Sequence, residues 1–287
     1  MNTTFIDKGN AIENNTFCGM IGADSEMIEL FASIKKIADI PINVLIVGES
    51  GTGKELVARA IHENSARSDK PFIVISGRSI QDNLLESELF GYVKGSFTGA
   101  YADKQGYFDL ANGGTIFLDE VSNYSITLQT QLTRVIQEKC FQRIGGTENI
   151  YVDVRIISST KSNLEDIIKR GEFRDDLYYR LNALPIIIPP LRKRKEDIPL
   201  LIRSFIEKYS KMFGKQNLNI STHAVEILMN YDFPGNVREL ENIIQRSIAL
   251  ENDSIILPDR LINNDQKFTT EITDKGINLN AELDAIE

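Results

Sequence analysis

Residues 43–54 read NVLIVGESGTGK: a short apolar run, a glycine-rich turn and a lysine. The apolar run at 43–47 predicts a buried strand, and the stretch at 54–63 predicts a helix. The turn between them fits the pattern G-x-x-x-x-G-K, in which backbone N–H groups surround phosphate oxygens and the helix N-terminus adds partial positive charge. We therefore expect a phosphate-binding loop at the end of a buried strand. The predicted nucleotide contacts in it are Gly48, Glu49, Ser50, Gly51, Thr52, Gly53, Lys54 and Glu55.

The lysine of this loop, Lys54, would bring a point charge to the β- and γ-phosphates of a nucleotide. Glu55 departs from the usual pattern, because Ser or Thr at this position would reach a magnesium ion. A glycine-rich turn with an incidental lysine is the plainer alternative. The predicted strand before the turn and the predicted helix after it favour the phosphate loop.

A second motif, GGTIFLDE at 113–120, is an apolar strand that ends in two adjacent carboxylates. Open α/β sheets bind ligands at the carboxyl ends of their strands. Asp119 would hold Mg²⁺, directly or through water, and Glu120 would polarise the attacking water in phosphoryl transfer. The alternative is a strand that ends in a solvated acidic turn. With a phosphate loop upstream, the pair predicts an Mg²⁺-dependent ATPase or GTPase, and the absence of an N-K-x-D motif favours ATP.

Strand patterns and helical patterns alternate through the first two thirds of the chain, which predicts a mostly parallel sheet flanked by helices. The further strand patterns lie at 72–75, 115–118, 152–158 and 183–188, and the further helical patterns at 24–37, 84–90 and 128–137. A basic cluster at 192–195 follows two prolines, and after it the pattern is entirely helical. The helical stretches at 198–213, 224–231 and 237–250 predict a small all-helical second unit.

Composition restricts the function classes. The chain has 287 residues, 32 basic and 41 acidic, for a net charge of -9. This balance argues against broad nonspecific binding to DNA or membranes. Two cysteines and two histidines disfavour a disulfide framework and a multi-histidine metal site, and no run is long enough to cross a membrane, so we expect a cytoplasmic protein. Residues 251–287 hold nine acidic and three basic residues, so much of the excess charge lies in a linker-like tail.

Five motifs occur in a fixed order: GESGTGKE at 48–55, GSFTGA at 95–100, GGTIFLDE at 113–120, FRDDLYYRLN at 173–182 and PGNVRELEN at 234–242. Together they resemble the central AAA+ ATPase domain of bacterial enhancer-binding proteins, the sigma-54-dependent transcriptional activators. The GSFTGA stretch is the most specific of them. In this family Glu is usual after the phosphate-loop lysine, so the resemblance makes Glu55 expected.

The resemblance implies an AAA+ P-loop fold with a helical lid, divided as a flexible lead-in at 1–17, an α/β subdomain at 18–190, a lid at 191–262 and an acidic linker at 263–287. Family members usually carry a regulatory domain before this unit and an enhancer-binding helix-turn-helix after it. Neither is visible, so we expect an excised fragment or a shortened protein. By itself it should bind neither enhancer DNA specifically nor a membrane.

The resemblance also implies a ring, usually a hexamer, with ATP between subunits. Arg174 and Arg180 match the arginines that reach the neighbour's γ-phosphate, where an arginine stabilises transition-state charge. Arg238 matches a sensor arginine at the start of a lid helix. The plainer alternatives are surface arginines paired with nearby carboxylates, such as Asp175 and Asp176.

Two further family positions depart from the common pattern here. Thr160, just beyond the fourth predicted strand, matches a first sensor threonine, but Lys161 follows it where Asn is frequent. Ser76 stands where the family usually has an Asn that restrains the catalytic glutamate. Since a hydroxyl is shorter than an amide, the restraint on Glu120 would be weaker or rerouted.

The loop at 95–100 would carry the output of the motor, and its members are Gly95, Ser96, Phe97, Thr98, Gly99 and Ala100. The resemblance implies that Phe97 and Thr98 contact sigma-54 in the RNA polymerase holoenzyme, and nearby promoter DNA, as ATP is hydrolysed. A loop whose phenylalanine folds back onto its own domain is the alternative. We expect a second pore loop at 121–128. Two rival functions remain open: an AAA+ remodeller that does not act on sigma-54, and a nucleotide-binding regulator without useful turnover.

Overall fold

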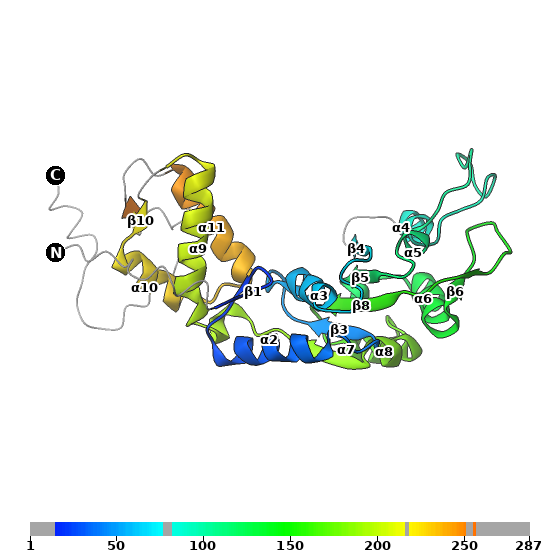
Figure 1. The fold of residues 1–287 in the computed structure, drawn as a ribbon, viewed down its shortest axis with the longest axis horizontal. Helices are drawn as coiled ribbons and strands as arrows, with labels where there is room; N and C mark the ends of the chain where they lie inside the picture. The colour runs from blue at the N-terminus through cyan, green and yellow to red at the C-terminus, as the bar shows by residue number, and fades with distance from the viewer. Residues whose placement is uncertain (1–14, 77–81, 216–217, 251–254, 257–287) are drawn as a thin grey trace.

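The centre of the molecule is a five-stranded parallel sheet (Figure 1). We describe a computed structural model in residues 15–76, 82–215, 218–250 and 255–256. In spatial order the strands are β4 (Phe72–Ser76), β5 (Thr115–Asp119), β8 (Arg155–Thr160), β3 (Val44–Val47) and β9 (Leu184–Ile187). All four neighbouring pairs are parallel. The predicted α/β fold with a mostly parallel sheet is confirmed.

Both faces of the sheet are buried, because side chains alternate between two cores along each strand. In β5, Ile116 and Leu118 belong to one core and Phe117 to the other. Helices α2 (Ser25–Ile37) and α3 (Lys54–Glu63) pack on the Phe117 side. The helices that contribute to the opposite core are α4 (Asp82–Phe90), α5 (Tyr107–Leu110), α6 (Ile126–Glu138), α7 (Leu164–Lys169) and α8 (Asp175–Leu181).

Helix α2 illustrates how local sequence specifies an element. The Asp24 side chain accepts a hydrogen bond from the amide of Glu26 and caps the helix start. Met27, Leu30 and Ile34 recur at helical spacing, and all three are buried. The helical prediction for 24–37 is therefore confirmed, with Asp24 as the cap.

The helical lid has its own apolar core, separate from the two sheet cores. It follows a short turn, η2 (Leu191–Lys193), and contains α9 (Asp197–Met212), α10 (Thr222–Asn230) and α11 (Asn236–Leu250). Two short parallel strands pair within the lid: β10 (Asn219–Ile220), between α9 and α10, and β11 (Ile255–Ile256), after α11. Figure 1 places this lid at one end of the molecule.

Two small hairpins flank the sheet. Strands β1 (Thr16–Phe17) and β2 (Met20–Ile21) pair beside α2, so regular structure begins inside the stretch predicted as a flexible lead-in. Strands β6 (Cys140–Phe141) and β7 (Ile150–Tyr151) enclose a loop at 142–149. That loop and the one at 91–102 lie at the end of the molecule away from the lid (Figure 1).

The strand predicted at 152–158 is present with different bounds. It begins at Arg155, because the amide of Val152 donates to the carbonyl of Lys139, and it runs on to include Thr160. The prediction of a second pore loop at 121–128 is wrong, because this stretch is not a loop. It forms a 3-10 turn, η1 (Val121–Asn123), and the first turn of α6, with the side chains of Val121 and Leu128 buried.

The predicted lead-in at 1–14 and the acidic linker at 263–287 lie outside the described residues. In the described part of the chain, no helix combines the length and apolar character that a membrane crossing needs.

Candidate nucleotide site

The glycine-rich turn connects β3 to α3, as the sequence predicted, and its ends are held by hydrogen bonds. The amide of Gly48 donates to the carbonyl of Thr160 on the neighbouring strand at 3.1 Å. The hydroxyl of Thr52 donates to the carbonyl of Glu49 at 2.9 Å, which closes the turn on itself. The loop is therefore fixed to the sheet at the carboxyl end of two adjacent strands.

The lid touches this loop directly at Gly51. Its φ of 80° lies in the left-handed region, and a Cβ built there would lie 2.2 Å from the carbonyl oxygen of Gly235. The amide of Arg238 donates to the carbonyl of Gly51 at 3.3 Å. Only glycine permits this approach, because any side chain would push the lid away.

Lys54 is buried against the catalytic carboxylate that the sequence predicted. Its Nζ lies 3.0 Å from Oε1 of Glu120, and the two side chains are 5% and 0% exposed. The same nitrogen donates to the carbonyls of Gly48 at 2.8 Å and Glu49 at 3.2 Å. All of these partners accept hydrogen bonds, as phosphate oxygens would.

The two carboxylates at the end of β5 are positioned by the adjacent strand β8. The hydroxyl of Ser159 donates to Oδ1 of Asp119 at 2.6 Å and accepts the amide of Glu120 at 2.9 Å. The amide of Lys161 donates to Oε2 of Glu120 at 3.3 Å. Glu120 has a φ of 55°, a left-handed conformation that turns its side chain back toward Lys54.

Ser159 was missed by sequence reasoning, although it precedes the residue that was chosen. Thr160 uses its hydroxyl locally: it donates to the carbonyl of Ser162 at 3.0 Å and accepts the amide of Ser162 at 3.1 Å. Lys161 in place of the frequent Asn leaves this contact intact, because the backbone amide of Lys161, and not its side chain, donates to Glu120. Ser76 ends β4 in register with Asp119, and its side chain is exposed.

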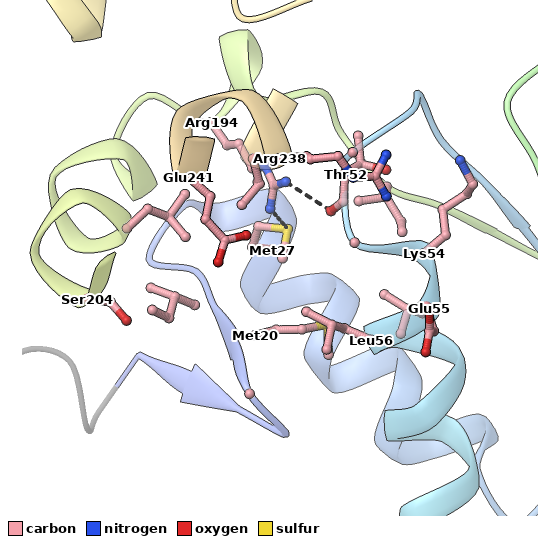
Figure 2. Close-up of a pocket in the computed structure, with 18 of the residues that line it drawn as sticks. Met20, Met27, Thr52, Lys54, Glu55, Leu56, Arg194, Ser204, Arg238 and Glu241 are labelled. Carbon is pink, nitrogen blue, oxygen red and sulfur yellow. Dashed lines mark hydrogen bonds between the residues drawn. The ribbon is translucent and has the colours of Figure 1, made fainter. Parts of the chain in front are cut away.

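A cavity of about 560 Å³ opens between the phosphate loop, the β1–β2 hairpin and the lid. Figure 2 shows side chains from all three parts facing it. Its polar end contains residues 51–55, Asp119 and Arg238, and its apolar end contains Met20, Ile21, Met27, Leu201 and Phe205. This size and this division between apolar and charged walls fit a nucleoside triphosphate.

Arg194, which the sequence did not single out, spans the base of the cavity. Its guanidinium donates to Sδ of Met27 at 3.1 Å and to the carbonyl of Thr52 at 3.2 Å, as Figure 2 shows. The side chain is 3% exposed, and burial lowers its pKa. Asp197 lies 3.8 Å away and accepts the amides of Ala23 and Asp24. Burial raises the pKa of Asp197.

Glu49 joins the phosphate loop to the start of the lid. It accepts two hydrogen bonds from Arg192, at 2.8 and 2.6 Å, and one from Asn236 at 3.1 Å. These bonds lower the pKa of Glu49 to about 2. Buried Asn236 also donates to the carbonyl of Ser50 at 3.0 Å and accepts the amide of Leu191 at 2.8 Å. Asn236 therefore has a structural role between the loop and the lid.

The predicted sensor arginine lies at the mouth of the cavity. Nη1 of Arg238 donates to the hydroxyl of Ser50 at 3.3 Å, and the side chain is exposed. Arg238 lies in the first turn of α11, and its backbone amide contacts the phosphate loop at Gly51. The structure thus places Arg238 where the sequence reasoning expected it.

A magnesium ion would have few protein ligands here. No cluster of three or more acidic, histidine or cysteine side chains exists among the described residues. Asp119 contributes one carboxylate to the cavity, and Glu55 is 58% exposed and lies 3.4 Å from Arg59. Mg²⁺ commonly binds through one or two carboxylates, phosphate oxygens and water, so the residues present fit an ion that arrives with a nucleotide.

Arg174 and Arg180 do not line this cavity. Arg174 donates to both carboxylate oxygens of Asp176, at 3.0 and 2.7 Å, which raises its pKa. The amide of Arg174 is held at 2.8 Å by the side chain of buried Gln129. Arg180 has a buried Nε without a hydrogen-bond partner in the described part of the chain. A contact of either arginine with a nucleotide remains a prediction.

The loop at 95–100 lies at the end of the molecule away from the lid and the cavity (Figure 1), and its base is hydrogen-bonded to the 142–149 loop. The amide of Val93 donates to the carbonyl of Ile144 at 3.1 Å, and the amide of Ile144 donates to the carbonyl of Gly91 at 3.0 Å. A Cβ at Gly145 would lie 2.6 Å from Cβ of Ser96. The segment that supports the 95–100 loop is thus 142–149.

Known sequences and structures resemble this chain along most of its length. Residues 20–187 match the sigma-54 interaction domain, and residues 192–275 match the AAA+ ATPase lid domain. The nitrogen fixation protein AnfA of Azotobacter vinelandii is 46% identical over 268 residues, which are 93% of this chain and 50% of AnfA. The Nif-specific regulatory protein of Klebsiella pneumoniae is 45% identical, over 90% of this chain and 48% of its own length.

Among solved structures, NtrX from Brucella abortus in complex with ATP superposes with a TM-score of 0.79 at 37% identity. The match covers 85% of this chain and 54% of NtrX. The chain thus spans about half the length of the relatives it matches.

Proposed function

Because the chain belongs to the sigma-54 interaction domain family and continues into an AAA+ lid domain, we propose that it hydrolyses ATP to remodel the closed complex of the sigma-54 RNA polymerase holoenzyme. One observation carries the proposal: Lys54, Glu120 and Asp119 meet at the polar end of a cavity of nucleotide size. This arrangement supports phosphoryl transfer from ATP to water.

In the proposed reaction, Lys54 exchanges Glu120 and two carbonyls for the phosphate oxygens of ATP. The exchange releases the Glu120 carboxylate, which then accepts a proton from the attacking water. Asp119 would hold magnesium, and its orientation depends on the hydroxyl of Ser159 at 2.6 Å. Magnesium, when bound, supplies positive charge to the phosphate oxygens.

We assign Arg174 and Arg180 to the site of a neighbouring subunit in a ring, which we propose to be a hexamer. Both lie outside the cavity of their own chain, and the buried Nε of Arg180 has no hydrogen-bond partner in the described part of the chain. An arginine supplied across an interface stabilises charge in the transition state. Assembly and turnover would then be coupled. Ser76, which ends its strand beside Asp119, and Thr160 remain candidates for sensing the nucleotide.

The output would be delivered by Phe97 and Thr98, at the end of the molecule away from the lid (Figure 1). Phe97 is 45% exposed between two glycines, which supports a role in contacting a partner. Sigma-54 is the proposed partner, with nearby promoter DNA as a second contact, and the proposed site of action is the cytoplasm, where RNA polymerase works.

Two measurements test this function. Phosphate release per subunit should rise with protein concentration, because the arginines act between subunits. Capture of sigma-54 should depend on ADP with a metal fluoride that mimics the transition state. Turnover without capture would indicate a remodeller of another target. Nucleotide binding with no turnover at any concentration would indicate a regulator and would contradict the proposal.

A further inference from the structure

The residue at the base of the partner loop, Tyr92, is fixed from both sides. Its amide donates to the carbonyl of Lys104 at 3.0 Å, and its carbonyl accepts the amide of Lys104 at 2.9 Å. On its other side it forms a bridge with Ile144 of the 142–149 loop. The backbone of Tyr92 is therefore held by Lys104 on one side and by the 142–149 loop on the other.

The side chain of Phe97, at the tip of the loop, has few restraints. Gly95 and Gly99 flank Phe97 with φ values of 84° and 108°, and a Cβ at either position would meet no atom within 4 Å. Such glycines can change conformation without steric cost. The backbone is held by four hydrogen bonds: Gly95 N–H to the carbonyl of Ala100 at 2.9 Å, Ala100 N–H to that of Phe97 at 3.1 Å, Tyr101 N–H to that of Gly99 at 2.9 Å and Ser96 N–H to that of Val93 at 3.2 Å. None of these bonds involves the side chain of Phe97.

Tyr92, at the base of the loop, and Phe97, at its tip, are in aromatic contact. The rings of Tyr92 and Phe97 have centroids 4.9 Å apart at an interplanar angle of 68°. This edge-to-face geometry is favourable beyond the area it buries. Part of the Phe97 ring is thereby covered by its own domain, so burial of the whole ring in a partner would require the ring to leave Tyr92.

We propose that Tyr92 is a positioning residue that holds the Phe97 ring against its own domain. It thereby sets the fraction of molecules in which Phe97 is released and available to contact sigma-54. This inference rests on the proposed function, which it extends from the contact residue to the residue that controls its availability. An aromatic pair of this kind changes the ratio of molecules with Phe97 against Tyr92 to molecules with Phe97 released by about twofold to tenfold. The ring of Tyr92 is essential to this role and its hydroxyl is not.

The test follows the loop without requiring a partner. Because the chain contains no tryptophan, Phe97→Trp introduces a single reporter whose exposure is measured by acrylamide quenching. In this background, Tyr92→Leu should increase quenching and Tyr92→Phe should not. The matched control is Tyr101→Leu, which changes a tyrosine that is 86% exposed on the same loop and outside the ring pair.

The second readout uses the 287-residue chain with Phe97 in place. Without a transition-state mimic, Tyr92→Leu should capture about twofold to tenfold more sigma-54, and Tyr92→Phe should restore the ordinary amount. Phosphate release should stay unchanged in both. Equal quenching in Tyr92→Leu and its parent would overturn the proposal, as would capture that still depends fully on the mimic. If the unsubstituted chain never captures sigma-54, the proposed function fails. The quenching comparison then still shows whether Tyr92 holds the side chain at position 97 against the domain.

Discussion

Nζ of Lys54 lies 3.0 Å from Oε1 of Glu120, so the cation of the phosphate loop and the proposed catalytic base form a buried ion pair. A buried pair is costly to break by removing one partner, because the other charge is left without compensation. A phosphate group that attracts Lys54 would release Glu120 at the same time. In the proposed reaction, the pair would couple nucleotide binding to activation of the base.

Glu120→Gln should preserve ATP binding and abolish turnover, because an amide keeps the shape of the side chain but accepts no proton. We expect kcat to fall by about 100-fold or more. ATP affinity, measured by calorimetry, should be retained or should increase, because Lys54 no longer has to leave a charged partner to bind phosphate. Glu138→Gln makes the same chemical change on the exposed side of α6 and should leave both quantities unchanged. Full hydrolysis by Glu120→Gln would refute the assignment.

Ser159→Ala should raise the magnesium concentration needed for half-maximal turnover. It removes the hydrogen bond of 2.6 Å to Asp119, and a bond to a charged group contributes roughly 1.5–3 kcal/mol, or about tenfold or more in affinity. The adjacent Ser158 is equally buried but donates to the carbonyl of Val44. Ser158→Ala is therefore the matched control. If both variants show the same magnesium titration, Ser159 does not orient the metal ligand.

A mixing experiment tests whether Arg180 acts between subunits. Arg180→Ala and Glu120→Gln should each be inactive alone. When they are mixed, some interfaces combine an intact Glu120 with an intact Arg180 from the neighbour, so phosphate release should recover in part. Arg174→Ala should behave in the same way. Mixtures that stay as inactive as their components would show that the arginine serves its own subunit. Arg134→Ala, an exposed change on α6, should have full activity.

Thr98→Ala should separate hydrolysis from output. Phosphate release should stay close to that of the unsubstituted chain, because Thr98 is exposed on a loop remote from the cavity. Open-complex formation, followed by permanganate reactivity of the melted promoter, should be lost. Thr130→Ala, on the exposed side of α6, controls for the loss of a threonine. Promoter melting by Thr98→Ala would remove this residue from the proposed contact.

The contact between Glu49 and Arg192 should make stability depend on pH. The pKa of Glu49 is lowered from 4.5 to about 2, so its stabilising effect is present above pH 4.5 and is lost as pH falls toward 2. The two side chains are 40% and 39% exposed, and solvent screening reduces the effect to about 1 kcal/mol or less. Arg192→Gln should flatten this part of the pH profile.

The measurement is urea unfolding of Arg192→Gln and the unsubstituted chain between pH 6 and pH 3. The control is Arg134→Gln, which removes an exposed arginine from its pair with Glu138 and leaves the lid contact intact. The unfolding free energy of Arg134→Gln should fall with decreasing pH as it does in the unsubstituted chain, because the contact between Glu49 and Arg192 is retained. A difference between Arg192→Gln and the unsubstituted chain that is the same at every pH would contradict the assigned role of Glu49.

The local sequence was sufficient for the elements that carry the chemistry. Glycines and a lysine after a run of buried β-branched and leucine side chains predict the phosphate loop. An apolar strand that ends in Asp119 and Glu120 predicts the acidic partner. These features depend on neighbours in sequence, so they are visible without the fold. The parallel sheet and the lid followed from the alternation of periodic patterns.

Contacts between residues distant in sequence could not be predicted in this way. Arg194 reaches Thr52 across 142 positions, and Asn236 reaches Ser50 across 186. The pairing of Ser159 with Asp119 depends on strand order, and the support of the 95–100 loop by 142–149 depends on where the hairpin lies. The sequence by itself determined which chemistry is present. The tertiary structure decided which groups meet, because the free energy of those contacts is gained only when distant segments pack together.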